Sequence, residues 1–216
     1  MFSSDRLRTV FACSALAATL AFAGVVAAQD GTPVISPSPM ASPMASVSVQ
    51  IALVDVEGNL VGTGAIAQSS GQVVIQISGR DIEPGEHGIH IHESGVCSAE
   101  GDMPFGAAGA HFNPTNASHG APTDADAHAG DLGNLLVGDD GAYTVSIATA
   151  KVTLEPGTPN SLRDADGSAL VIHANADDLM TDPTGNSGDR IACGIIYPST
   201  TVGTPGAATP AATPAS

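Results

Sequence analysis

Six of the seven histidines in this 216-residue chain lie between residues 87 and 128, and Asp131 follows them closely. Imidazole nitrogens and carboxylate oxygens are the ligands that zinc commonly takes, and imidazole also suits copper. The seventh histidine, His173, stands alone much further along the chain. The segment therefore predicts a metal site with enough ligands for two ions.

The segment Gly88-Ile89-His90-Ile91-His92 alternates apolar residues with histidine. A β-strand points residues i and i+2 to the same face, so His90 and His92 can reach one ion. Such a pair alone is more often ordinary polar surface, and the neighbouring histidines are what favour a ligand role. His87 has the opposite parity, so we expect it to face away from the ion and to be structural.

A second group of candidate ligands lies in a stretch rich in Gly, Pro, Asn and Ala, where no helix or strand period persists: His111, His119, His128 and Asp131. Three imidazoles and one carboxylate form the closed tetrahedral shell that zinc accepts. Redox-active copper instead favours imidazole nitrogens in a flattened arrangement, for which His90, His92 and His173 supply three. His111 is the natural fourth, and its deprotonated ring can bind both metals.

These motifs resemble the copper/zinc superoxide dismutase family, in order and in approximate spacing, from about Ser46 to Tyr197. The matching segments are Gly85-Glu86-His87-Gly88-Ile89-His90-Ile91-His92-Glu93, Gly109-Ala110-His111-Phe112-Asn113-Pro114, His128-Ala129-Gly130-Asp131-Leu132-Gly133-Asn134, Leu170-Val171-Ile172-His173-Ala174 with Ala176-Asp177-Asp178, and Gly185-Asn186-Ser187-Gly188-Asp189-Arg190-Ile191-Ala192-Cys193-Gly194.

The resemblance implies a ligand set for each metal. Copper would be bound by His90, His92, His111 and His173, and zinc by His111, His119, His128 and Asp131. Asp177 matches the carboxylate that hydrogen-bonds one histidine of each metal, here His90 and His119, and fixes their orientation.

The implied reaction converts two superoxide anions and two protons to oxygen and hydrogen peroxide as copper alternates between Cu(II) and Cu(I). Arg190 would guide the anion, and His111 would be the immediate proton donor. The alternative from another class is a protein that binds or stores copper and zinc without turnover, which needs the ligands but not Arg190.

Eight short runs of alternating or β-branched residues predict an all-β fold, an antiparallel Greek-key sandwich or flattened barrel. The runs are residues 47–56, 60–68, 72–78, 87–92, 132–137, 142–148, 169–174 and 190–197. Turn sequences such as Ser69-Ser70-Gly71 separate several of them. Two long connections, residues 93–131 and 174–189, carry or border the metal residues, and loops of such length are usually functional.

The termini predict export. Residues 1–28 read as a secretory signal peptide, with two arginines before an apolar run and small residues before Gln29. Residues 29–46 form a Pro/Ser/Met linker, the dismutase-like domain spans 47–198, and 199–216 form a disordered Thr/Pro/Ala tail. Loss of Cys13 with the signal leaves Cys97 and Cys193, an even pair that predicts a disulfide in a secreted or extracytoplasmic protein. Met40 and Met44 in the linker are read as filler.

The chain after the signal keeps 4 basic and 21 acidic residues, for a net charge of −17. Nucleic acid is therefore excluded as a partner, and stable membrane insertion is not expected once the signal is removed. The partners that remain are the small anionic substrate and, at most, a second copy in a homodimer. The loop at residues 174–189 contains no lysine and four aspartates, so we expect weak long-range attraction of anions.

Overall fold

A computed structural model describes residues 47–201 of the chain. The signal and linker predictions, and most of the predicted tail, lie outside these residues and stay predictions. Ser199 and Thr200, at the start of the predicted tail, donate backbone hydrogen bonds to the carbonyl oxygens of Gly95 and Ala165. In residues 47–201 no helix has the length and apolar character needed to cross a membrane.

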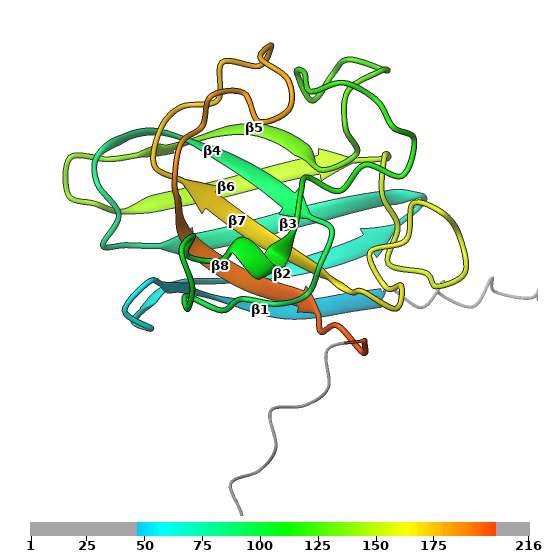
Figure 1. The fold of residues 1–216 in the computed structure, drawn as a ribbon, viewed down its shortest axis with the longest axis horizontal. Coiled ribbons are helices and arrows are strands. Elements are labelled where there is room, and N and C mark those ends of the chain that lie inside the picture. Colours follow the sequence, from blue (N-terminus) through cyan, green and yellow to red (C-terminus); the bar gives the residue numbers. More distant parts are fainter. Residues whose placement is uncertain (1–46, 202–216) are drawn as a thin grey trace, which may run out of the picture. The chain divides into compact units, whose positions relative to one another are not determined.

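Eight antiparallel strands make up the fold (Figure 1). Their bounds are β1 Val47–Asp55, β2 Leu60–Ser69, β3 Gln72–Gly79, β4 Gly85–His92, β5 Asp131–Val137, β6 Tyr143–Thr149, β7 Ser168–His173 and β8 Arg190–Tyr197. All eight predicted strands are present, each within about two residues of its expected bounds. A short 3-10 helix, η1 at Gly106–Ala108, is the only helical element in residues 47–201. The sequence did not predict it.

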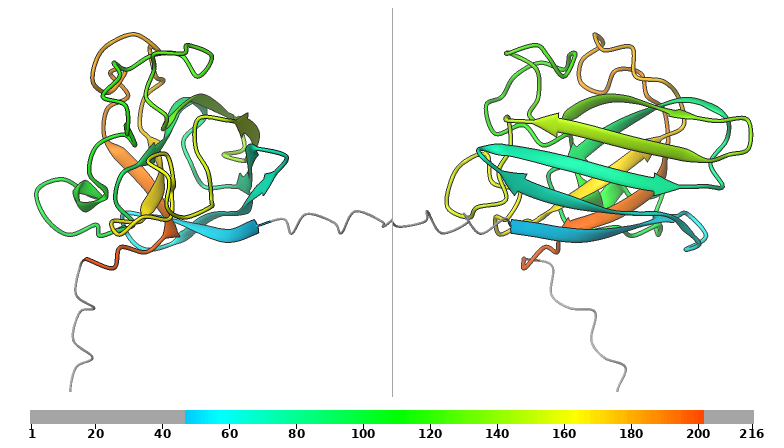
Figure 2. Two further views of the ribbon diagram at one scale, coloured as in Figure 1. Left: turned by 90° about the vertical axis from the view of Figure 1, so that its right-hand side faces the viewer. Right: turned by 180° about the vertical axis from the view of Figure 1, so that it is seen from behind.

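The strands form one sheet in the order β5-β4-β7-β8-β1-β2-β3-β6, which curls into a nearly closed Greek-key barrel (Figure 2). Strand alternation fills its interior, where Leu53, Ile66, Ile75 and Ile89 are fully buried. The β2–β3 turn has positive φ at Ser70 (53°) and Gly71 (81°), as a two-residue hairpin that follows the twist of its strands requires. The predicted fold class is confirmed.

Two strands are buried along both faces. Every residue of β7 is buried, and so are His87 to His92 of β4. Leu170 and Ile172 face the barrel core, whereas Ala169 and Val171 pack outside it against Phe105 and Ala108 of the connection after β4. The barrel wall therefore has a second covering of loop on its outer side, at β4, β7 and β8.

Three long connections join the strands. The connections after β4 and after β7 rise side by side over one side of the barrel (Figures 1 and 2). The third, residues 150–167 between β6 and β7, was not singled out from the sequence. Its buried residues Val152, Leu154 and Leu162 join the barrel core, so this connection contributes to packing.

The predicted disulfide between Cys97 and Cys193 is present, with a Cα–Cα distance of 5.7 Å. It joins the connection after β4 to β8 on the outer side of the barrel, where Cys193 is fully buried. The covalent bond and the small cluster around Phe105 hold the loop against the strands that carry the candidate ligands.

Candidate metal centre

The candidate ligands lie on the outer face of the barrel wall, beneath the two covering loops. In β4, Ile89 and Ile91 point into the core, so the alternating His90 and His92 point out of it. His173 ends the neighbouring strand β7, which pairs with β4 through Ile89 and Ile172. His111 is brought to the edge of β4 by an isolated antiparallel bridge to His92.

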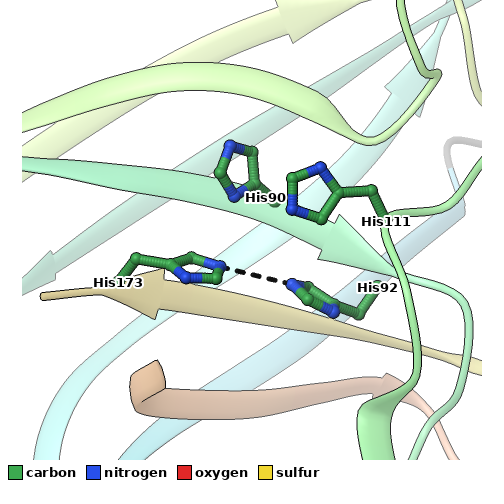
Figure 3. A group of neighbouring side chains, drawn as sticks. All are labelled: His90, His92, His111 and His173. Carbon is green, nitrogen blue, oxygen red and sulfur yellow. Dashed lines mark hydrogen bonds between the residues drawn. The ribbon is translucent and has the colours of Figure 1, made fainter. Parts of the chain in front are cut away.

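His90, His92, His111 and His173 form one cluster, in which one ligand atom from each lies within 4.8 Å of all the others. All four residues are buried. Figure 3 shows the rings converging from β4, the end of β7 and the connection after β4. The structure thus brings together the four residues predicted as copper ligands.

The rings of His92 and His173 direct nitrogen lone pairs toward each other. Nδ1 of His92 lies 2.9 Å from the carbonyl oxygen of Gly109, and Nδ1 of His173 lies 3.2 Å from that of Gly188. A carbonyl oxygen only accepts, so each Nδ1 carries the hydrogen and each Nε2 is left with a lone pair. The two Nε2 atoms are 3.4 Å apart. A hydrogen bond between them would need a further proton, whereas a cation satisfies both.

Two more nitrogens in the cluster are buried without any hydrogen-bond partner, Nδ1 of His90 and Nε2 of His111. Buried polar atoms are nearly always paired, and unpaired ones indicate a missing ion or a functional role. The Nε2 of His90 is 2.7 Å from Asp177, so Nδ1 is the ring nitrogen whose lone pair is available to a metal ion. Four nitrogen lone pairs therefore meet in one buried space, and this donor set fits copper.

A second cluster centres on Asp131, whose Oδ1 faces the Nδ1 atoms of three histidines. The distances are 2.9 Å to His111, 3.1 Å to His119 and 3.2 Å to His128. Ligands of a tetrahedral zinc ion at its usual bond lengths are about 3.3 Å apart, so these spacings match the edges of such a shell.

His90 also belongs to a compact group with His111, His119 and Asp131. We assign His128 rather than His90 to the second cluster, because Nε2 of His90 is already held by Asp177 and its Nδ1 belongs to the first cluster. His111 is the member common to both clusters, with Nδ1 toward Asp131 and Nε2 without a partner.

Asp177 connects the two clusters from the loop after β7. Its Oδ2 is 2.7 Å from Nε2 of His90, and its Oδ1 is 2.9 Å from Nε2 of His119. A side chain at Gly185 would collide with this carboxylate and with His119, so only glycine permits the loop to pass so closely. The two contacts match the bridging role that the resemblance implied for Asp177.

Arg190 lines a cavity of about 880 Å³ whose wall also includes His92, His111 and His173. Its guanidinium donates to the carbonyl oxygens of Phe105 and Gly109, each at 2.6 Å. Within residues 47–201 no carboxylate lies within ion-pair distance of it, and it forms no ion pair with the adjacent Asp189. Burial lowers the pKa of Arg190 from its very high ordinary value, and the group stays charged at neutral pH.

Several contacts at the centre had no signal in the sequence. The carbonyl oxygens of Gly109 and Gly188 fix the tautomers of His92 and His173, and any residue type provides a carbonyl. His87 lies outside both clusters, with Nδ1 2.7 Å from the carbonyl oxygen of His173 and Nε2 2.8 Å from that of Glu83. It therefore supports the backbone of a candidate ligand, in keeping with the structural role expected of it.

The buried histidines make the metal-free protein sensitive to acid. Burial lowers the pKa of His111 to about 4 and that of His173 to about 3, whereas an unfolded histidine titrates near 6.5. The unfolded chain therefore binds more protons than the folded one below pH 6.5, and the folded state loses stability as the pH falls from about 6.5 toward 4. Lowered pKa values at Asp131 and Asp177 act in the same direction at still lower pH.

We expect the melting temperature of the metal-free protein to fall steadily between pH 7 and pH 4. Scanning calorimetry in buffers of constant ionic strength measures this, and the metal-loaded protein is the control, because bound metal competes with protons for the same nitrogens. A melting temperature that stays constant over this range would mean that the histidines are not buried as described.

Comparison with known proteins places the chain in a family. The family model for copper/zinc superoxide dismutase (SODC) matches residues 60–196. Superoxide dismutase [Cu-Zn] 2 of Aquifex aeolicus (strain VF5) is 39% identical over 145 residues, which cover 67% of this chain and 83% of that one. A superoxide dismutase-like protein of Bacillus subtilis (strain 168) is 42% identical over 148 residues, covering 68% of this chain and 74% of that one.

Solved structures agree. The crystal structure of a SOD-like protein from Bacillus subtilis is similar with a TM-score of 0.62 and 41% identity, covering 68% of this chain and 97% of that one. The copper/zinc superoxide dismutase from Brucella abortus gives a TM-score of 0.59 at 28% identity, covering 70% of this chain and all of the other. With its eight-stranded barrel and its two histidine clusters, the chain belongs to the copper/zinc superoxide dismutase family.

Proposed function

We propose that this protein is an exported superoxide dismutase that converts two superoxide anions and two protons to oxygen and hydrogen peroxide. In this proposal His90, His92, His111 and His173 hold copper, and His111, His119, His128 and Asp131 hold zinc. The observation that carries it is the position of His111, whose Nδ1 faces Asp131 while its Nε2 is buried without a partner among the other three histidines.

Copper, when bound, supplies the one-electron oxidation of one superoxide and the one-electron reduction of the next, while zinc supplies fixed positive charge beside it. The residues of the chain hold the geometry. Asp177 orients His90 and His119 together, and the carbonyl oxygens of Gly109 and Gly188 orient His92 and His173. Such outer contacts fix the tautomer of each ring and raise its basicity as a ligand.

Arg190 binds the anion. Its two hydrogen bonds to backbone carbonyls fix the guanidinium beside the cavity without neutralising its charge. Screening over about 10 Å at 0.1 M salt mutes the distant carboxylates of this acidic chain. The local field at the cavity is then set by the arginine and the bound metals.

His111 supplies the proton. Its Nε2 has no hydrogen-bond partner, so it is free to hold a proton between the two electron transfers. In the proposed site Nδ1 belongs to the zinc half, so Nε2 is the ring nitrogen that would carry the proton and pass it to the more basic peroxide product.

Export of the protein is part of the proposal. The disulfide between Cys97 and Cys193 is typical of extracytoplasmic proteins, and the signal-like start of the chain supports the same location. The strongly negative charge disfavours binding to nucleic acid and to anionic membranes. Whether the protein acts as a monomer or a homodimer stays a prediction.

A metal-binding protein without turnover is the second candidate, because a similar sequence and a similar crystal structure, both from Bacillus subtilis, are described only as superoxide dismutase-like. Arg190 distinguishes the two functions, since storage does not require a cationic side chain in the cavity wall. Metal analysis and a superoxide assay on the same preparation test the proposal. We expect one copper and one zinc ion per chain, and rapid dismutation of superoxide. A fully metallated but inactive protein would instead support the storage function.

Replacing Arg190 with alanine should lower kcat/KM for superoxide by about tenfold, the lower end of the effect of electrostatic steering on association. Copper and zinc content should not change, because the guanidinium contacts carbonyl oxygens and no candidate ligand atom. Arg163→Ala is the matched control, since Arg163 stacks on Tyr197 and does not line the cavity. Equal losses in both variants would show that overall charge, not the position of Arg190, matters.

The wild-type rate should depend only weakly on ionic strength. The loop after β7 has no lysine and exposes Asp178, Asp182 and Asp189, so it provides no extended positive field. Rates measured by pulse radiolysis between about 10 and 200 mM salt should change by less than about threefold, whereas strongly steered reactions fall steeply as salt is added. A steep rise at low salt would point to attraction by other groups.

A further inference from the structure

The two covering loops meet at a carboxylate that belongs to neither candidate ligand set. Asp182, in the loop after β7, reaches across to the connection after β4, where His119 and His128 lie. We infer that Asp182 is a positioning residue for the zinc half of the site, acting on these two histidines together. This inference rests on the proposed zinc-binding role of the second cluster.

The first contact fixes His119 through its backbone. Oδ1 of Asp182 accepts a hydrogen bond from the backbone nitrogen of His119 at 2.6 Å. The ring of the same residue is held at Nδ1 by Asp131 and at Nε2 by Asp177. Since carboxylates from three places in the chain hold both the backbone and the ring, His119 has little freedom to turn away from the position that a zinc ion requires.

The second contact concerns the ring of His128. Its Nδ1 lies 3.2 Å from Asp131. In the proposed zinc site Nδ1 is therefore the ligand atom, and the ring hydrogen belongs on Nε2. That Nε2 is 3.9 Å from Oδ1 of Asp182 and makes no hydrogen bond within residues 47–201. The distance is too long for a hydrogen bond, but negative charge on this side favours hydrogen at Nε2 and makes Nδ1 a stronger donor. The effect is moderated by solvent, because 59% of the Asp182 side chain is exposed.

Other aspartates of the same loop do not share this position. Asp178 turns back into its own loop, where it accepts hydrogen bonds from Thr181 and Asn186. The Asp189 carboxylate, which is also exposed, makes no hydrogen bond or ion pair within the described part of the chain. Asp182 alone among these three contacts the connection that carries the proposed zinc ligands, so simple solubility does not account for its placement.

The test compares Asp182→Asn with Asp189→Asn in the full mature chain. Both changes remove one negative charge from the same loop, and the asparagine at residue 182 retains an oxygen that can accept from His119. Asp182→Ala removes that acceptor as well. Zinc affinity of the metal-free protein is measured at pH 7 by competition with a chromogenic chelator, and the metal-free melting temperature of each variant serves as the measure of folding.

We expect zinc to bind about tenfold more weakly to Asp182→Asn, the lower end of the loss caused by removing an outer partner of a ligand. Asp182→Ala should lose more, and Asp189→Asn should stay within about twofold of the wild type. If Asp182→Asn matches Asp189→Asn while the wild type binds zinc and dismutates superoxide, the inference is wrong and the proposed function stands. If the wild type takes up no zinc, the zinc half of the proposed function fails and the inference fails with it.

Discussion

Replacing His173 with alanine should abolish superoxide dismutation and copper binding while the barrel stays folded. His173 supplies the only candidate ligand from β7, and its Nε2 faces that of His92 at 3.4 Å. Loss of a group that hydrogen-bonds a metal ligand lowers metal affinity or activity 10- to 100-fold. Because His173 is placed as a ligand itself, we expect the loss of copper affinity and of activity to exceed about a hundredfold.

The metal-free His173→Ala protein should retain its cooperative unfolding, because the imidazole lies outside the barrel core and borders the cavity. Copper content, superoxide assay and the metal-free melting curve are the three measurements. Met103→Leu is the control, since this exposed methionine lines the same cavity without belonging to the cluster. Full copper occupancy in the His173→Ala protein would contradict the proposed ligand set.

Among the variants considered, replacing both Cys97 and Cys193 with serine should produce the largest loss of folding stability. The disulfide closes a loop with a sequence separation of 96 residues. For loops near that length the chain-entropy account gives a stabilisation of about 4 to 5 kcal/mol. Denaturant unfolding of the metal-free protein should therefore show a free energy of unfolding lower by about 4 kcal/mol than that of the oxidised wild type.

Activity should fall as well, because the bridged loop provides the carbonyl oxygens of Phe105 and Gly109 that hold Arg190. Wild-type protein treated with a reductant is the matched control, since it breaks the same bond without changing the sequence. A change below about 1 kcal/mol in both cases would mean that packing among Phe105, Ala108, Ala169 and Val171 holds the loop without the disulfide.

The strands could be predicted from the sequence because their alternation is strong and local. In β4 the pattern of isoleucine and histidine determines which side chains enter the core, and in the paired strand β7 Leu170 and Ile172 face the core in the same alternating way. The candidate ligands could be found because histidine is rare in this chain and gathers in one segment. Residue type and parity therefore carried most of the information about the barrel and about the first cluster.

The contacts made by loops could not be predicted in this way. Asp182 contacts His119 across 63 positions of sequence, and Arg190 is held by carbonyl oxygens that have no residue-specific signal. The connection at residues 150–167 looked like an ordinary long loop, yet Leu154 and Leu162 are fully buried. Such contacts depend on how irregular segments pack against each other, which no periodic pattern records.

The separation of the metal centre from the barrel interior has a consequence for how such a protein can change. The core is filled by apolar side chains, most of them aliphatic, and the histidine clusters sit on its outer wall. Substitutions in the loops can therefore alter metal preference, anion access or reaction rate while the architecture survives intact. This modularity makes the loops a natural target for engineering.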